Sequence, residues 1–99
     1  MLLPVAHVSV IIQAMDDGAV LFAPESELYY GLNTVGLRIW QLLPPHTQTL
    51  DALVETLGRE YPDVPAGQLA ADVRELLDVL VSEGLAAWPQ PAALDAPVP

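Results

Sequence analysis

Residues 28–43, Leu-Tyr-Tyr-Gly-Leu-Asn-Thr-Val-Gly-Leu-Arg-Ile-Trp-Gln-Leu-Leu, predict an aromatic strand that runs directly into an amphipathic helix. Asn33 or Thr34 can cap the helix start, because a short polar side chain accepts hydrogen bonds from the free N–H groups of the first turn. Apolar residues then recur at helical spacing, and Pro44 and Pro45 end the helix. Strand and helix leave no loop between them for catalytic groups. The stretch is typical of a scaffold that displays a strand edge.

The residues before this stretch predict two further strands. Residues 5–12 are rich in β-branched side chains, which favour strands, and residues 19–23 form the return strand. The Asp16-Asp17-Gly18 sequence between them indicates a tight hairpin turn. Residues 24–26 predict the next turn, before a third strand at residues 27–32. Three consecutive strands are expected to pair in order as an antiparallel meander.

The residues after the stretch predict two more helices. Thr49 is the expected N-cap of a helix that ends before Pro62, with its apolar residues on one face. A third helix begins near Pro65 and ends at Gly84, which supplies the left-handed residue after the helix. Residues 85–88 are expected to form a short extended piece along the core. The sequence therefore predicts an α+β fold, a three-stranded antiparallel β-meander followed by three helices, with the outline of a winged helix.

Length and composition predict one domain with a short tail. The 99 residues fit one domain at residues 1–88, and the proline-rich residues 89–99 are expected to be disordered. Cysteine is absent, which excludes disulfides and thiolate metal sites. No apolar run approaches the roughly 18 residues that a membrane span needs, and the N-terminus lacks the basic region of a signal peptide. We expect the protein in the cytoplasm.

The charge is strongly one-sided. Thirteen carboxylates face three arginines, giving a formal net charge of −10. This charge repels phosphate backbones and anionic lipid, which argues against nucleic-acid binding by the winged-helix outline and against a membrane partner. The acidic residues can simply keep a small apolar protein in solution, or they can also favour a basic partner. Both interpretations stay open.

The sequence contains no recognisable catalytic or metal-binding constellation. His7 lies in a predicted strand and His46 in a proline-flanked loop, and nothing places them together at ligand spacing. Asp16 and Asp17 fit a turn better than a metal pair. No serine stands in a nucleophile elbow, and no glycine-rich loop could hold phosphate. We therefore predict a protein that is not an enzyme, with no catalytic residue, metal or cofactor.

The predicted third strand has features of a peptide-binding edge. An unpaired edge exposes N–H and C=O groups that can pair with an added strand, which could also come from a second copy of this chain. Tyr29 and Tyr30 offer large rings with polar tips, and Gly31 permits close backbone approach. Alternation turns Leu28, Tyr30 and Leu32 toward the core and Tyr29 away from it. With the third helix beside this strand, a peptide would lie in the groove, and Tyr29 and the helix face would carry its affinity.

Residues 29–43 resemble the hallmark of the PqqD-like family: an aromatic strand, Leu-Asn, a small residue or proline, Gly, then Ile-Trp-x-Leu. Residues 49–53 and 72–85 are similar to the family's second and third helices, so the resemblance covers about residues 5–86. Thr34 stands where the family commonly has proline. The acidity is also unusual, which leaves open whether the cognate leader peptide is basic.

The resemblance implies a recognition element for precursors of ribosomally made, post-translationally modified peptides. Such a domain captures the leader peptide as an extra strand on its third strand, against its third helix. It delivers the precursor to a modifying enzyme or leader peptidase. The stand-alone form of lasso-peptide biosynthesis is favoured; the alternatives are a chaperone of a radical-SAM enzyme and a structural docking subunit. On this chain the implied peptide-binding residues are Leu28, Tyr29, Tyr30, Gly31, Asp72, Val73, Leu76 and Leu80.

Overall fold

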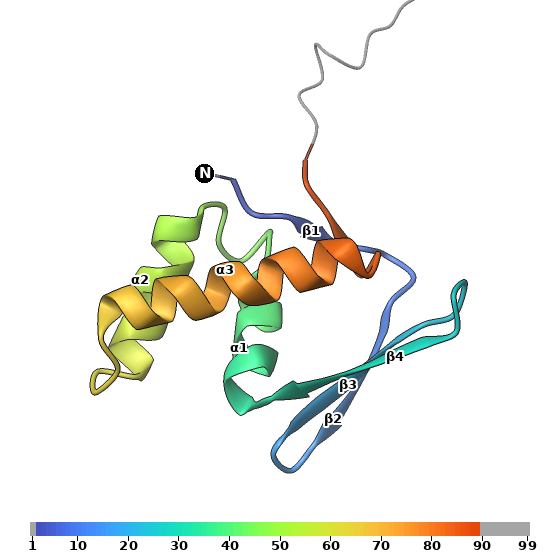
Figure 1. The fold of residues 1–99 in the computed structure, drawn as a ribbon, viewed down its shortest axis with the longest axis horizontal. Coiled ribbons are helices and arrows are strands. Elements are labelled where there is room, and N and C mark those ends of the chain that lie inside the picture. The colour runs from blue at the N-terminus through green and yellow to red at the C-terminus, as the bar shows by residue number, and fades with distance from the viewer. Residues whose placement is uncertain (1, 90–99) are drawn as a thin grey trace, which may run out of the picture.

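A three-stranded antiparallel sheet and three helices make up most of the computed structural model, which describes residues 2–89 (Figure 1). Their order confirms the predicted α+β fold, with the sheet followed by the helices. Residues 90–99 of the predicted disordered tail lie outside the described residues. The elements are β1 (Val5–Ala6), β2 (Ile11–Met15), β3 (Gly18–Ala23), β4 (Leu28–Asn33), α1 (Thr34–Leu42), α2 (Leu50–Glu60), α3 (Ala66–Ser82) and β5 (Ala86–Ala87).

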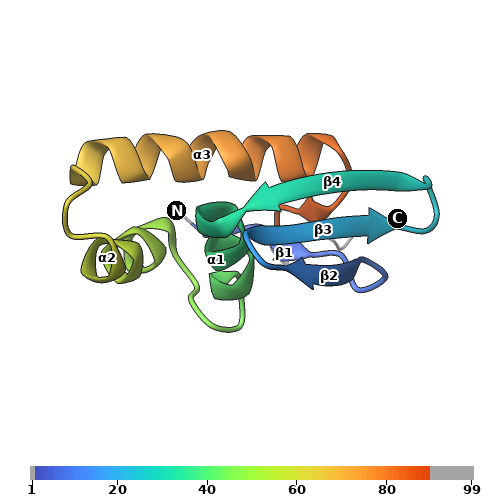
Figure 2. The same ribbon diagram turned by 90° about the horizontal axis from the view of Figure 1, so that it is seen from below.

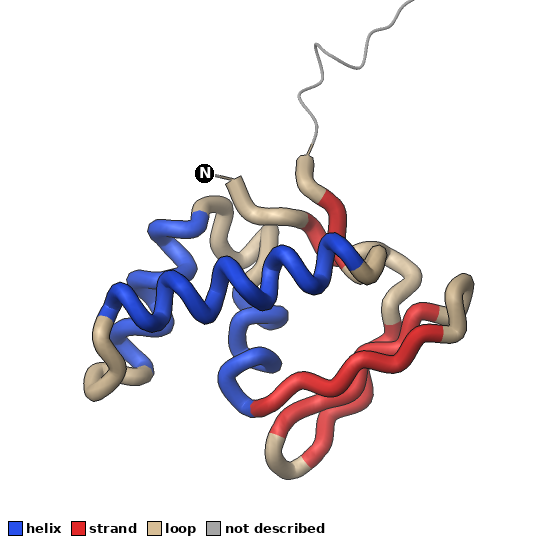
Figure 3. Tube along the Cα trace, viewed as in Figure 1, coloured by secondary structure: helices blue, strands red, loops and turns tan. Residues whose placement is uncertain are grey.

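The main sheet has the strand order β2-β3-β4 and forms the predicted meander (Figure 3). Met15 pairs with Gly18, so only Asp16 and Asp17 connect β2 to β3. Gly18 has φ +150°, and a Cβ there would come within 1.9 Å of the carbonyl oxygen of Leu32 on β4. Glycine is therefore required twice at this position, for its backbone angle and for the close approach of β4.

The predicted first strand at residues 5–12 is two strands, which corrects the sequence-based boundary. Val5 and Ala6 pair with Ala87 and Ala86, so β1 and β5 form a separate two-stranded sheet. The break between β1 and β2 follows from a local turn at His7, whose Nδ1 accepts a hydrogen bond from the backbone N–H of Ser9 (3.2 Å). Such local side-chain bonds compete with the hydrogen bonds of a continuous strand. The predicted extended piece at residues 85–88 is present as β5.

The helices begin and end where the capping residues predict. The side chain of Asn33 accepts from the N–H of Gly36 (2.7 Å) at the start of α1, and Thr49 does the same for Ala52 (3.1 Å) at the start of α2. After α3, Gly84 has φ +79°, and the N–H of Leu85 donates to the carbonyl of Leu80 (2.8 Å). This is the bond that satisfies the last helix carbonyls in a left-handed cap.

The core lies between one face of the sheet and the three helices. Figure 2 shows α3 running alongside β4, with α1 between the sheet and α2. Leucines from β3, α2 and α3 are completely buried there, and no charged or polar residue is buried with them in residues 2–89. Arg38 on α1 and Glu60 at the end of α2 join these two helices at the surface, with a closest N–O distance of 2.7 Å. The fully buried core leucines include Leu21, Leu53, Leu57, Leu77 and Leu80.

Candidate functional site: the groove between β4 and α3

β4 is an edge strand of the main sheet. Its neighbour on one side is β3, and no described strand lies on its other side. Apart from the bonds to β3 and within α1, residues 28–33 make no backbone hydrogen bond to another described segment. β4 therefore has a free edge with unpaired N–H and C=O groups, the feature that permits strand addition.

The register identifies which residues present these free groups. A two-residue hairpin makes Met15 and Gly18 a hydrogen-bonded pair, and bonded pairs alternate with non-bonded pairs along an antiparallel ladder. The backbone N–H and C=O groups of Gly18, Val20 and Phe22 on β3 therefore face β2. Those of Ala19, Leu21 and Ala23 face β4. Carried across to β4, this alternation directs the N–H and C=O of Tyr29 and Gly31 to the free edge.

A second observation agrees with this assignment. The carbonyl oxygen of Leu32 lies so close to Gly18 that it must point toward β3. Its neighbour Gly31 then points its backbone groups the opposite way, toward the free edge. Gly31 is exposed, and a Cβ built on it meets nothing within 4 Å. The backbone at Gly31 is thus open to an incoming strand.

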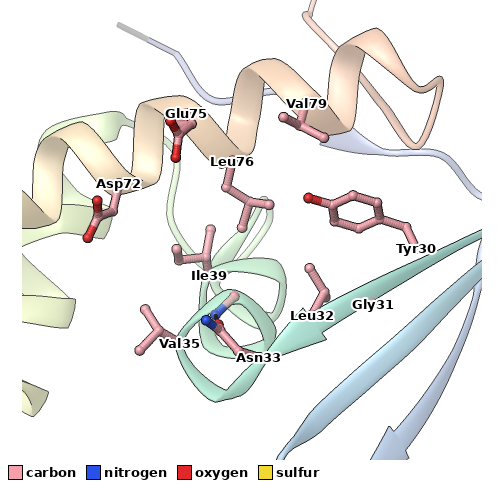
Figure 4. Close-up of a pocket in the computed structure, with 11 residues that line it drawn as sticks. Tyr30, Gly31, Leu32, Asn33, Val35, Ile39, Asp72, Glu75, Leu76 and Val79 are labelled. Carbon is pink, nitrogen blue, oxygen red and sulfur yellow. Dashed lines mark hydrogen bonds between the residues drawn. The ribbon is translucent and has the colours of Figure 1, made fainter.

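A groove with a cavity of about 480 Å³ lies between β4, the start of α1 and α3 (Figure 4). Tyr30 extends from β4 toward Val79 on α3, and Leu76 points from α3 toward Ile39 on α1. This cavity borders the edge strand directly, so side chains of an added strand could enter it. The lining residues are Tyr30, Gly31, Leu32, Asn33, Val35, Gly36, Ile39, Asp72, Glu75, Leu76 and Val79.

The structure brings four of the eight predicted peptide-binding residues together in this groove. Tyr30 and Gly31 line it from β4, and Asp72 and Leu76 line it from α3. Leu28 lies two residues before Tyr30 on the same face of β4. It packs against the core at the far end of the strand. Its side chain does not line the cavity.

The side chain of Tyr29 lies on the other face of the sheet. It is 69% exposed, and its ring stacks against that of Phe22 with centroids 4.6 Å apart. The two residues are direct partners in the β3–β4 register. The expectation that the Tyr29 ring carries peptide affinity therefore has no support from its position. Its backbone, however, remains part of the free edge.

Val73 and Leu80 do not line the groove, which corrects their assignment to its wall. Both are 0% exposed and belong to the core cluster. The reason is helical periodicity, because α3 carries two apolar stripes side by side. The buried stripe is Leu69, Val73, Leu77 and Leu80, and the groove stripe contains Leu76 and Val79.

Seven lining residues were not among the predicted ones, and Leu32, Asn33 and Gly36 are three of them. The other four come from the two helices. Val35 and Ile39 come from α1, and Glu75 and Val79 from α3. A signal for Val79 was available, since residues 72, 76 and 79 follow a spacing of four and three along one helix face. The contribution of α1 depends on how that helix packs against β4, and a residue pattern within one element does not contain this information.

The groove is acidic on its α3 side. Asp72 and Glu75 are exposed, and neither makes a hydrogen bond or ion pair with a described residue. The arginines among residues 2–89 lie elsewhere. Arg38 is bound to Glu60, Arg59 lies 3.4 Å from Glu55, and Arg74 borders a separate small cavity near Trp88.

A second cavity of about 430 Å³ lies at the other edge of the sheet, beside β2. It is formed by β2, α1 and the loop after α1, and its lining includes Ile12, Leu37 and Trp40. β2 is the other edge strand of the sheet. This cavity is the natural comparison site for any experiment on the groove at β4.

Neither a metal-binding cluster nor a membrane-spanning helix is found in residues 2–89. No three His, Cys, Asp or Glu side chains of that region gather so that they could hold a metal ion. His7 and His46 border different cavities. None of the described helices is both long enough and apolar enough to cross a membrane.

Comparisons with known proteins agree with this geometry. No curated protein sequence matches the chain at a significant level. Among solved structures, the chain is similar to TbiB1 in complex with the TbiA(beta) leader peptide, with 28% identity and a TM-score of 0.76. The similarity covers 88% of this chain and 99% of that chain. Residues 18–86 match the family described as coenzyme PQQ synthesis protein D (PqqD), whose domains are typically non-catalytic binding domains. Because this match spans more than half of its residues, the chain belongs to the PqqD family.

Proposed function

We propose that this protein binds the leader segment of a ribosomally made precursor peptide as an added strand on β4, against α3. The observation that carries the proposal is the free edge of β4 beside a cavity of about 480 Å³. The similarity to TbiB1, which was solved with a leader peptide, supports it. The leader and its modifying enzyme or leader peptidase are the proposed partners.

The two halves of the groove have different roles in this proposal. Backbone groups at Tyr29 and Gly31 pair with the leader and give affinity that depends little on sequence. Alternate leader side chains enter the cavity and contact Tyr30 and Leu76, which gives specificity. Asp72 lies at the groove's polar side. Leu28 packs at the far end of the strand. Val73 and Leu80 belong to α3 and anchor that helix by packing in the core.

The protein acts without catalysis in this account. By holding the precursor near an enzyme, it raises the effective concentration of the two reactants. Ribosomal precursors are made in the cytoplasm, and we place the step there. We favour a leader peptidase of the lasso-peptide type as the enzyme, with a radical-SAM enzyme as the alternative. Gel filtration of the protein with each enzyme, with and without the precursor, distinguishes these partners from a docking subunit that needs no leader.

Fluorescence anisotropy tests the binding directly. The probes are fluorescein-labelled synthetic peptides that correspond to the leader segments of short open reading frames beside the gene. We expect one of them to bind wild-type protein saturably and to bind Leu76→Asp much more weakly. Leu37→Asp is the matched control, because Leu37 is also a half-buried helical leucine but lines the cavity at β2.

Circular dichroism of each variant shows that it is folded before its affinity is compared. Equal loss of binding in Leu76→Asp and Leu37→Asp, or saturable binding that neither variant changes, would contradict the β4 groove. Failure of every leader to bind folded wild-type protein would contradict leader binding itself.

A further inference from the structure

The groove at β4 has an apolar part and an acidic part next to each other. Tyr30, Leu76 and Val79 form the apolar part, while Asp72 and Glu75 lie toward the N-terminal end of α3 (Figure 4). A peptide that filled only the apolar part would leave the two carboxylates beside it without a partner. The charges of the groove therefore constrain which side chains the peptide carries, in addition to the constraint that the shape of the groove imposes.

No residue in the described range 2–89 compensates the negative charge of the groove. No arginine lines the cavity, and the protein has no lysine. Asp72 and Glu75 form no ion pair with a described residue. An acidic side chain on the peptide would be repelled at this point, and a lysine or arginine would be attracted.

The geometry of helix and strand sets the spacing between the apolar residue and the basic residue that the groove would accept. The step of four positions from Asp72 to Leu76 corresponds to a rise of about 6 Å along α3. Side chains on one face of an extended peptide repeat every two residues, or about 6.6 Å. In Figure 4, Tyr30 lies beside Val79, and Asp72 lies past the end of β4 on the side of Val35. A peptide that pairs with β4 and continues past its end would therefore bring its next same-face residue toward Asp72, because the two repeats are similar in length.

We infer that the leader of this protein carries a lysine or arginine two positions from an apolar anchor residue, and that Asp72 and Glu75 select the basic residue. This inference rests on the proposed function and adds the charge and spacing of its ligand. It also gives the acidic composition of α3 a role in choosing among leaders.

The test is a double-mutant cycle on the leader that binds in the anisotropy experiment. The peptide is used as encoded and with its basic residue changed to glutamine. The protein is used as wild type and as Asp72→Asn/Glu75→Gln. The control variant Asp78→Asn/Glu83→Gln removes the same charge from α3 and its C-cap but outside the groove, since Asp78 borders the cavity with Arg74.

We expect the basic residue to strengthen binding to wild-type protein by about two- to fivefold, because an exposed ion pair contributes only modestly. The same peptide change should have no effect on the Asp72→Asn/Glu75→Gln protein and a full effect on the Asp78→Asn/Glu83→Gln protein. The advantage should disappear in about 1 M NaCl, where the screening length is near 3 Å.

Three results would distinguish a failure of the charge inference from a failure of leader binding itself. An equal effect of the peptide change in wild-type and Asp72→Asn/Glu75→Gln protein would overturn the inference while leaving leader binding intact. So would a leader that binds tightly without a basic residue two positions from its apolar anchor. Absence of any leader binding would overturn both the proposed function and this inference.

Discussion

The rings of Phe22 and Tyr29 stack with centroids 4.6 Å apart on the sheet face opposite the core. This pairing accounts for an exposed tyrosine on an edge strand. Tyr30, the next residue, is directed toward α3 and lines the groove. Adjacent tyrosines thus belong to different surfaces, and their substitutions should have different consequences.

We predict that Tyr29→Ala leaves leader affinity within about twofold of wild type, because the ring lies outside the groove and exposed substitutions of this kind have small effects. It should lower stability by about 0.5–1.5 kcal/mol through loss of the ring pair. Tyr30→Ala should weaken leader binding clearly. Anisotropy and urea denaturation of both variants measure the two effects. A large affinity loss confined to Tyr29→Ala would place the peptide on the other face of the sheet.

The two apolar stripes of α3 should separate stability from binding. Leu80 is completely buried, so Leu80→Ala should lower the free energy of unfolding by about 2–5 kcal/mol. Leu76 is half-buried, so Leu76→Ala should destabilise the protein much less while weakening leader binding. Urea denaturation and anisotropy of both variants check this. If Leu76→Ala destabilised as much as Leu80→Ala, then Leu76 would be a core residue and the groove would be filled.

Gly18 should be among the glycines least tolerant of substitution. Gly18→Ala forces a side chain into φ +150° and against the Leu32 carbonyl oxygen at 1.9 Å. Strain of this kind costs on the order of 1–3 kcal/mol. Gly31→Ala is the control, since its Cβ meets nothing within 4 Å. Thermal denaturation should show a clearly lower Tm for Gly18→Ala alone. Similar Tm values for the two variants would contradict the tight β2–β3 connection.

The Arg38–Glu60 pair should give a small acid-dependent stability. The hydrogen bond from Arg38 lowers the pKa of Glu60. A lowered pKa in the folded state stabilises the protein above the unfolded pKa of about 4.3, and this contribution is lost as the pH falls through the folded pKa. Both side chains are about one-third exposed, so the contribution stays below about 1 kcal/mol.

Wild type should therefore be slightly more stable than Glu60→Gln at neutral pH, and the difference should vanish in acid below the folded pKa of Glu60. Glu55→Gln, at an ion pair that is far more exposed, is the control and should show no such difference. A gap between wild type and Glu60→Gln that persists unchanged in acid would show that the carboxylate charge is not its cause.

Much of the fold could be predicted because its signals are local. Asn33, Thr49 and Gly84 mark helix ends through bonds that span only a few residues, and the structure contains each of them. The separate pairing of β1 could not be predicted in the same way. The turn at His7 that divides β1 from β2 is local, but β1 pairs with β5 through Val5 and Ala87, which are at opposite ends of the described chain.

The edge strand beside the groove could be predicted from the sequence, whereas the set of residues that line the groove could be predicted only in part. Alternation along β4 correctly turned Tyr30 and Leu32 inward, and β4 is the edge strand that the meander requires. The assignment of Val73 and Leu80 to the groove was wrong, because the family pattern on α3 includes both apolar stripes. Which stripe faces β4 is decided by the packing of α1 and α2, through residues such as Ile39 and Leu53.

The most direct measurement of strand addition compares Gly31→Pro with Gly31→Ala in the leader anisotropy titration. Proline removes the N–H that faces the free edge and leaves the bonds between β3 and β4 in place, whereas alanine keeps that N–H. The account predicts near wild-type affinity for Gly31→Ala and severe loss for Gly31→Pro, with both proteins folded. Equal affinity of the two variants would contradict binding of the leader as an added strand on β4.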